Sequence, residues 1–341
     1  MSHKALFLSA PKGAFTVQDR PTPTPGANQI LVRTRAVALN PAEYKEYDTG
    51  LFLKKWPMVL GRDVAGSVVS IGSDVDKFKP GDSVLSFSIF SLENDPDQGT
   101  FQEYVLCYSH LTSRIPKGFL FESAASLPTG LGTAAGLLRR VGLDVTKIAN
   151  KTEKSDVVLI WGGSSSVGTS AIQFASAAGA VVFTTASPQH HEYLRQLGAD
   201  AVFDYKSSEI ADDIVEEASD RGLVITKFVD AVSANLAITA AVVSKLGGGT
   251  LATVLPWEMM NKVPPPDNVT PEMSGLRDAL VEKDYCSHVF NDLVPDRLRD
   301  GYIRPAKTVL VPGGLSGIEA GLNTLRNGVS GVKLVASIKG R

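Results

Sequence analysis

The sequence has few of the features that mark secreted, membrane-spanning or nucleic-acid-binding proteins. Only two of its 341 residues are cysteines, Cys107 and Cys286, which excludes a disulfide scaffold and favours a reducing compartment, so we expect the cytoplasm. The apolar run Ala5–Leu8 near the N-terminus is too short for a secretory signal or a membrane span, and we expect no membrane association. The net charge is -2 without a long run of one sign, so we expect no nucleic-acid partner.

The motifs of metal and nucleophilic catalysis are also missing. A zinc site needs three or four Cys, His or carboxylate ligands held together, and none of the five histidines forms such a ligand cluster with either cysteine. The patterns H-E-x-x-H, Cys-x-x-Cys and G-x-S-x-G do not occur. We therefore expect neither a metal ion nor a serine nucleophile on a nucleophile elbow.

What the sequence does contain is enough apolar material for a folded core. Hydrophobic residues make up 43% and charged residues 21% of the chain, as is ordinary for a soluble globular protein. Up to about Leu120, short β-branched runs alternate with Gly, Pro and Asp, and the stretch 29–41 reads as a strand ended by Asn-Pro. Short strands with frequent turn residues predict a small β-barrel or sandwich.

From about Phe121 onward, candidate strands alternate with candidate helices. The strand segments are 156–162, 180–187, 200–205, 225–232 and 249–255, and a helical pattern follows each of the first four. Such a βαβ series predicts a parallel, doubly wound sheet. After about Asn291 a strand, a helix and a last apolar strand follow, whereas the Pro-rich stretch 256–275 is predicted to be an irregular surface loop.

The first βα unit carries a candidate phosphate loop. The stretch 157–180 reads as a strand, a tight turn and a helix, with Gly162 at the turn and Gly168 where helix and strand would approach each other. Ser165 stands where the usual fingerprint has its middle glycine, and it offers a hydroxyl as well as a backbone N–H. The helix that starts near Val167 would add its N-terminal N–H groups and its dipole. The alternative is a turn of small residues that only packs a strand on a helix.

The end of the second strand indicates which dinucleotide the loop would bind. NAD sites place an Asp or Glu about 20 residues after the glycines, where it binds the ribose 2′-OH. Residues 185–187 are Thr-Ala-Ser, so no carboxylate would repel a 2′-phosphate. Ser187 and His190 can donate hydrogen bonds to phosphate, and Tyr205 and Lys206 follow the third strand. The pattern favours NADPH, with the alternative that these are ordinary loop residues.

Segments along nearly the whole chain resemble the medium-chain dehydrogenase/reductase family. They are "VALNPAEYKEYDTG", "VLGRDVAGSVVSIGSDVDKFKPGDSV", "FESAASLPTGLGTAAGLL", "QLGADAVFDYKSSE" and "LRNGVSGVKLVASI". The resemblance implies an α/β fold with two domains. One is a GroES-like β-barrel catalytic domain, residues 1–122 with 300–341, and the other is a Rossmann domain with a doubly wound parallel sheet, residues 123–299.

Within that family the sequence resembles the zinc-free quinone oxidoreductase and enoyl reductase branch. Zinc-dependent members carry a Cys after the first barrel strand and a Gly-His-Glu in the second stretch, where this sequence has Asn40-Pro41 and Gly61-Arg62-Asp63. The segments "GGSSSVG", "ASPQHH", "FDYK" and "DPDQGTF" are similar to those of fungal trans-acting enoyl reductases and CipB-like oxidoreductases. The resemblance therefore implies that no metal takes part.

The resemblance also implies roles for individual residues. Cofactor contacts fall on Asn40, Lys45, Gly162, Ser165, Ser166, Val167, Gly168, Ser187, His190, Tyr205, Val254, Leu255 and Lys333. The substrate pocket would be lined by Phe52, Thr129, Gly130 and Thr133. Mitochondrial-type enoyl reductases place a tyrosine acid where this chain has Leu51. Lys45 is then the favoured catalytic residue, Tyr44 and Tyr47 are nearby alternatives, and water is a further proton source.

These expectations combine into one function. An NADPH-dependent reductase would transfer hydride to the conjugated C=C of an α,β-unsaturated carbonyl compound, an enoyl or alkenal substrate such as a polyketide or other secondary-metabolite intermediate, free or carrier-tethered. The alternatives are an NADPH-dependent quinone reductase and a family member that binds NADPH without redox catalysis. The chain would be a monomer or a homodimer.

Overall fold

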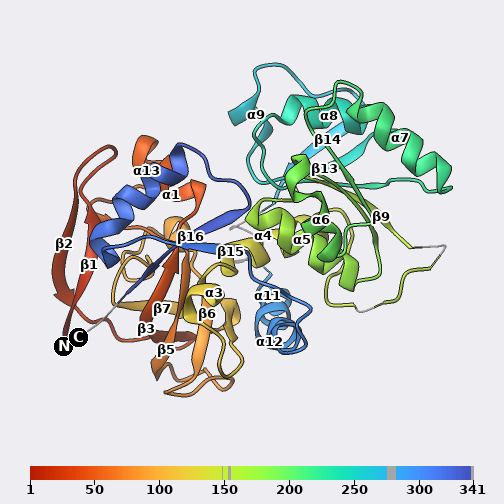
Figure 1. Ribbon diagram of the computed structural model, residues 1–341. Coiled ribbons are helices and arrows are strands. Elements are labelled where there is room, and N and C mark those ends of the chain that lie inside the picture. The colour runs from red at the N-terminus through yellow and green to blue at the C-terminus, as the bar shows by residue number, and fades with distance from the viewer. Residues whose placement is uncertain (148, 153–154, 275–281, 339–341) are drawn as a thin grey trace. The chain divides into compact units, whose positions relative to one another are not determined.

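The computed structural model describes residues 1–147, 149–152, 155–274 and 282–338 (Figure 1). The chain forms two compact units, Met1–Thr129 with Ala279–Arg341 and Gly130–Asp278. Among the helices that the structure describes, none is long and apolar enough to cross a membrane. Each unit has its own sheets and its own apolar core, so each is described separately.

The first unit is a β-barrel of short strands. A three-stranded sheet has the order β2-β1-β4, and a second sheet has the order β15-β16-β3-β5-β6-β8 with β7 also paired to β3. The strands are β1 (Ser2–Leu8), β2 (Phe15–Pro21), β3 (Gln29–Ala38), β4 (Met58–Val59), β5 (Asp63–Ile71), β6 (Ser83–Phe87), β7 (Tyr104–Tyr108), β8 (Thr112–Arg114), β15 (Lys307–Leu310) and β16 (Val332–Ser337). Inward-facing side chains such as Ile30, Val32 and Val64 form the core, as the alternating pattern of a half-buried strand predicts.

Short helices close the barrel. They are α1 (Pro41–Thr49), α2 (Phe90–Glu93), α3 (Phe121–Ala125), α11 (Lys283–Ser287), α12 (Val294–Arg299) and α13 (Ile318–Arg326), with 3-10 turns η1 (Ser109–Leu111) and η4 (Gly314–Gly317) and a π-helical segment η3 (His288–Leu293). Asn40, which follows β3, is the N-cap of α1, and Pro41 is its first residue. Proline is favoured there because its fixed φ suits the first turn.

The first unit contains two segments that the sequence assigned to the dinucleotide-binding domain, residues 123–129 and 282–299. The reason is packing: α3 contacts β3 and β5, and α11 contacts η1. In addition, the Asn291 side-chain amide donates to the carbonyl oxygens of Ser109 at 2.8 Å and Thr112 at 2.7 Å. The sequence could not show these contacts because they join residues about 180 positions apart.

The second unit is a parallel sheet with helices. Its strands are β9 (Val157–Trp161), β10 (Val181–Thr185), β11 (Ala201–Phe203), β12 (Lys227–Asp230), β13 (Gly249–Thr253) and β14 (Val269–Met273). Its helices are α4 (Pro128–Arg140), which starts just before the boundary, α5 (Ser166–Ala177), α6 (His191–Gln196), α7 (Ile210–Asp220), α8 (Leu236–Lys245) and α9 (Trp257–Met260), with a 3-10 turn η2 (Pro188–His190). Buried residues such as Leu159, Phe183, Phe228 and Leu251 form the core. The doubly wound prediction is confirmed.

The strand order β11-β10-β9-β12-β13-β14 marks where a ligand would bind. The chain moves outward from β9 to β10 and β11, and then crosses back to place β12 on the other side of β9. This reversal is the topological switch point of an open parallel sheet, where ligands bind in the crevice at the carboxyl ends of the strands. The carboxyl ends of β9, β12 and β13 are therefore the places to look for a site.

The Pro-rich stretch 256–275 is not wholly irregular, so that prediction was wrong in part. It contains α9 and then β14, which pairs in parallel with β13 from Val269 to Met273. Pro271 lies in this strand and is the reason the sequence looked unlike one. Proline cannot donate to a ladder, but an edge strand tolerates it, and β14 is the edge of this sheet.

Candidate active site

The loop after β9 presents hydrogen-bond donors at the N-terminus of α5. Ser165 is the N-cap, and its Oγ accepts a hydrogen bond from the Gly168 N–H at 2.9 Å. That contact uses a lone pair, so the Ser165 hydroxyl proton stays available to a ligand. In the part of the chain that the structure describes, the N–H groups of Ser166 and Val167 have no acceptor. The helix dipole adds positive potential at the same place, so the loop suits a pyrophosphate.

Glycines make this loop compact. Gly162 has a left-handed φ of 83°, and a Cβ on Gly168 would lie 2.3 Å from the Gly162 carbonyl oxygen. Only glycine at position 168 permits this approach of helix to strand, as the sequence predicted. Gly130 also packs closely, because a Cβ there would lie 2.6 Å from the Ser166 carbonyl oxygen. Gly130 therefore allows α4 to contact the start of α5, and its role as a substrate-lining residue stays a prediction.

The carboxyl ends of β10 and β11 carry the residues predicted to meet an adenosine 2′-phosphate. Ser187 follows β10 and Tyr205 follows β11, which is its parallel neighbour. Ser187 is half-buried and is the N-cap of η2, where its side chain makes no capping hydrogen bond with the residues that the structure describes, and His190 ends that turn. The Lys206 ammonium lies 5.7 Å from the Tyr205 ring centroid. Asp204, the nearest carboxylate along β11, accepts the Lys206 N–H at 3.1 Å.

The segment after β13 is fixed by two hydrogen bonds. The Thr253 hydroxyl donates to the carbonyl oxygen of Leu255 at 2.8 Å, and the Val254 N–H donates to Ser233 Oγ at 3.2 Å. Val254 and Leu255 are both half-buried. They lie at the end of a strand near the switch point, as a segment that flanks a nicotinamide would.

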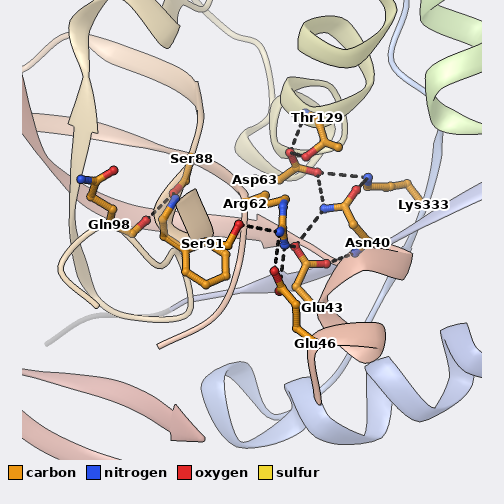
Figure 2. Close-up of polar contacts among 11 residues, drawn as sticks. Asn40, Glu43, Glu46, Arg62, Asp63, Ser88, Ser91, Gln98, Thr129 and Lys333 are labelled. Carbon is orange, nitrogen blue, oxygen red and sulfur yellow. Dashed lines mark hydrogen bonds and ion pairs between the residues drawn. The ribbon is translucent and has the colours of Figure 1, made fainter. Parts of the chain in front are cut away.

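In the first unit, three residues predicted from different parts of the sequence meet around Asp63 (Figure 2). Asp63 is fully buried and accepts from the Thr129 N–H at 2.7 Å, the Thr129 hydroxyl at 2.5 Å and the Asn40 side-chain amide at 3.0 Å. Lys333 lies on β16, and its Nζ is 3.0 Å from Asp63 Oδ2. The same ammonium donates to Asn40 Oδ1 at 2.5 Å. The structure thus brings Asn40, Thr129 and Lys333 together. Their contacts with cofactor or substrate stay predictions.

Beside Asp63 lies a buried arginine whose partners sequence reasoning missed. Arg62 donates to Glu46 at 2.5 and 3.0 Å, to Glu43 at 3.4 Å and to Ser91 Oγ at 3.0 Å. Its guanidinium also lies 5.0 Å from the Phe90 ring centroid. The side chains of Arg62, Glu43 and Glu46 are at most 2% exposed. One signal was present, since Arg62 and Asp63 interrupt an apolar stretch, and charges in such a place must be paired when buried.

Glu43 makes this cluster sensitive to pH. Burial raises the pKa of Glu43 to about 7, although the Arg62 charge opposes the shift. A carboxyl whose pKa is higher in the folded than in the unfolded state stabilises the fold while protonated, and this contribution is lost as pH rises from about 4.5 to about 7. We expect Glu43→Gln to remove this loss, which is on the order of 3 kcal/mol.

The measurement is the free energy of unfolding in urea at several pH values between 5 and 8. As the pH rises across this range, the free energy of unfolding of Glu43→Gln should increase relative to that of the wild type. Asp296→Asn, which removes an exposed partner of Arg299, is the control and should not change the profile. Parallel profiles for Glu43→Gln and the wild type would show that Glu43 does not titrate in this window.

The three candidate catalytic residues of α1 have different surroundings. The Arg326 guanidinium lies 5.6 Å from the Tyr44 ring centroid and 5.5 Å from that of Tyr47. Tyr47 also stacks on Phe15 at 5.5 Å, and both tyrosine rings pack against the barrel core. Lys45 is half-buried and its side chain has no partner among the described residues. Burial lowers the pKa of the Lys45 ammonium, and a lower pKa makes the ammonium a stronger proton donor.

Two further substrate-lining candidates belong to different units. Phe52 follows α1 in the first unit; it is 42% exposed, with a φ of 65°. Thr133 lies on α4 in the second unit and is half-buried. Because they belong to different units, their shared role stays a prediction.

The residues at the positions where zinc-dependent relatives hold their metal do not form a suitable donor set. Asn40 and Arg62 stand at two of these positions, and a guanidinium has no lone pair to give to a metal. The third, Asp63, is already engaged by Asn40, Thr129 and Lys333. Within the described residues, no group of three or more His, Cys, Asp or Glu side chains could hold a metal ion.

Comparisons with known proteins match both units. Residues 26–117 match the family model of the alcohol dehydrogenase GroES-like domain, and residues 166–272 match that of the zinc-binding dehydrogenase. Trans-enoyl reductase tndF of Aspergillus flavipes is 35% identical over 342 residues, which cover 98% of this chain and 99% of the relative. The zinc-binding alcohol dehydrogenase domain-containing protein cipB of Emericella nidulans is 31% identical over 341 residues, 99% of both chains.

The fold has solved counterparts as well. The quinone oxidoreductase from Coxiella burnetii superposes with a TM-score of 0.69 at 24% identity, over 99% of this chain and 100% of that one. With a GroES-like barrel, a Rossmann sheet and relatives that it matches end to end, the chain belongs to the medium-chain dehydrogenase/reductase family, a family of nicotinamide-dependent oxidoreductases. Within it, the chain is similar to fungal proteins named as trans-enoyl reductases. The family resemblance and the fold class predicted from the sequence are confirmed.

Proposed function

We propose that this protein is an NADPH-dependent, zinc-independent reductase of the C=C bond in α,β-unsaturated carbonyl compounds. The observation that carries the proposal is the pair of sites in the second unit. Donors at the start of α5 suit a pyrophosphate, and hydroxyl-bearing residues stand at the end of β10 where NAD sites carry a carboxylate. The named activity of trans-enoyl reductase relatives supports the choice of substrate.

The preference for NADPH rests on charge. The Ser187 hydroxyl could donate a hydrogen bond to a 2′-phosphate beside it. Lys206, which follows the neighbouring strand β11, adds a positive charge. A ribose 2′-OH alone would lack the carboxylate acceptor that NAD sites supply. The Asp204 carboxylate would repel a 2′-phosphate, but it already accepts a hydrogen bond from the Lys206 backbone N–H. The balance of donors over acceptors at this edge therefore supports NADPH over NADH.

In the proposed reaction, the donors at the start of α5 would hold NADPH, which would supply a hydride to the β-carbon of the substrate. The protein's residues would bind and orient both molecules, because the cofactor carries the difficult chemistry. Charge that moves to the carbonyl oxygen needs a hydrogen-bond donor, and the α-carbon needs a proton. Lys45 is our proposed proton donor, since its half-buried ammonium has a pKa lowered by burial. Water is the alternative donor.

A steady-state assay tests the proposal. NADPH oxidation should be measured with simple enones, alkenals, pantetheine thioesters of enoyl acids and simple quinones, each with and without a metal chelator. We expect turnover of enones or enoyl thioesters to exceed that of quinones, and the chelator to have no effect. Faster turnover of quinones would favour quinone reduction instead. Tight NADPH binding without turnover of any acceptor would favour a non-redox family member.

The same assay tests Lys45. Lys45→Met should lower kcat for the favoured enone and remove the basic limb of its pH profile, whereas Tyr44→Phe should change neither. Lys45→Arg keeps a charge but donates poorly near neutral pH, so it should resemble Lys45→Met. A wild-type rate in Lys45→Met would assign the proton to water.

A further inference from the structure

A buried carboxylate organises the turn that follows β12. Asp230 is fully buried and its Oδ1 accepts the backbone N–H groups of Val232 at 2.9 Å and Ser233 at 2.7 Å. Its Oδ2 accepts the Thr239 hydroxyl from α8 at 2.8 Å. Residues 230–233, which we term the 230–233 turn, are thus held from inside by three hydrogen bonds to one side chain.

The turn ends in a strained residue. Ser233 is fully buried with a φ of 53°, in the left-handed region that non-glycine residues seldom adopt. Its hydroxyl oxygen accepts the Val254 N–H from the segment after β13 at 3.2 Å. A glycine would relieve the strain but could not make this contact. The serine is therefore explained by its hydroxyl and not by its backbone.

The other side of the turn touches the phosphate loop. Asp230 pairs with Trp161 across the β9–β12 ladder, and the Ala231 N–H donates to the Trp161 carbonyl oxygen at 3.0 Å. Val232 packs directly on Gly162, because a Cβ on Gly162 would lie 2.1 Å from a methyl carbon of Val232. The turn thus contacts Gly162 on one side and Val254 on the other, both at the carboxyl ends of the strands.

We propose that the 230–233 turn is a positioning element for the dinucleotide, and that Ser233 sets the place of the segment Val254–Leu255 relative to the phosphate loop. The inference rests on the proposed function, in which the loop binds the pyrophosphate and Val254–Leu255 flanks the nicotinamide. Ser233 acts through Val254 and touches no reacting atom. Its loss would disturb the nicotinamide half of the site and leave the adenosine half intact.

The test compares two ligands on two variants. Ser233→Ala keeps the left-handed backbone without the hydroxyl, and Ser233→Gly removes both the hydroxyl and the strain. Affinities for NADPH and for adenosine 2′,5′-bisphosphate, which covers only the adenosine half, are measured by titration calorimetry. We expect both variants to weaken NADPH binding about tenfold, as the loss of one positioned hydrogen bond would, with unchanged affinity for the bisphosphate. Ser244→Ala, whose hydroxyl contacts Asn268 away from the turn, should change neither affinity.

Three results would overturn the inference. Ser233→Gly with wild-type NADPH affinity would show that the hydroxyl positions nothing. Equal weakening of both ligands in Ser233→Ala and Ser233→Gly would indicate a general structural role. If the wild type bound neither ligand, the proposed function would fail and the inference with it. Wild-type binding is thus measured first, which separates the two failures.

Discussion

Replacement of Ser187 by Asp should weaken NADPH binding about 100-fold and leave NADH binding no weaker. The new carboxylate would stand at the end of β10, where the proposed 2′-phosphate lies beside the turn capped by Ser187. Two like charges about 4 Å apart repel by about 4 kcal/mol at the effective dielectric constant of a protein surface. Solvent screening reduces this, and about 100-fold corresponds to about 3 kcal/mol. The same carboxylate could accept the 2′-OH of NADH.

Fluorescence titration of both cofactors measures the effect. Ser187→Asn is the matched control, since it has the size of Asp without its charge, and it should cost much less NADPH affinity. The ratio of the two cofactor affinities is the informative quantity, because a general disturbance of the loop would weaken both. An unchanged ratio in Ser187→Asp would mean that the 2′-phosphate does not bind at the end of β10.

Replacement of Arg62 by Met should destabilise the protein by about 3–5 kcal/mol, which is the usual cost of removing one partner from a buried ion pair. Arg62 is 2% exposed and donates to both Glu43 and Glu46. Without it, at least one of these buried carboxyl groups would have to stay charged without a cation or take up a proton. The penalty should therefore shrink at acid pH, where both can be protonated.

Urea unfolding at neutral pH measures this penalty. The double variant Arg62→Met with Glu46→Gln should recover part of the lost stability, because it removes the unpaired charge as well. Arg299→Met is the surface control; its partner Asp296 is 2.9 Å away but both are more than 60% exposed, and such pairs contribute about 1 kcal/mol or less. Equal losses in Arg62→Met and Arg299→Met would contradict the buried-pair account.

The sequence predicted the parts of the fold that local patterns encode. The central strands of the second unit are continuous buried apolar runs such as 157–161, and these are recognisable without long-range information. The phosphate loop was likewise recognisable because its glycines and its N-cap serine are close together in the chain. In contrast, β14 was missed because Pro271 and polar neighbours hide a strand that only the edge position permits.

The candidate site in the barrel was predictable only as a set of separate residues. Lys333 and Asn40 are 293 positions apart, yet they share a hydrogen bond. No periodicity or motif in the sequence predicts that contact. Tyr44, Tyr47 and Lys45 are neighbours in the chain, but the helix turns the two tyrosines toward Arg326 and leaves the lysine without that contact, because successive residues of a helix point about 100° apart. Which side chain is engaged depends on α13, which lies far along the sequence.

Pro271 also affects whether another chain could add a strand to this sheet. β14 is an edge strand, and an exposed edge with a full row of N–H and C=O groups invites another chain to add a strand, the first step of many aggregation reactions. A proline removes one donor from that row. A strand that approached the outer side of β14 could not form a regular hydrogen-bond ladder past Pro271. The proline would therefore disfavour the addition of a further strand to this edge.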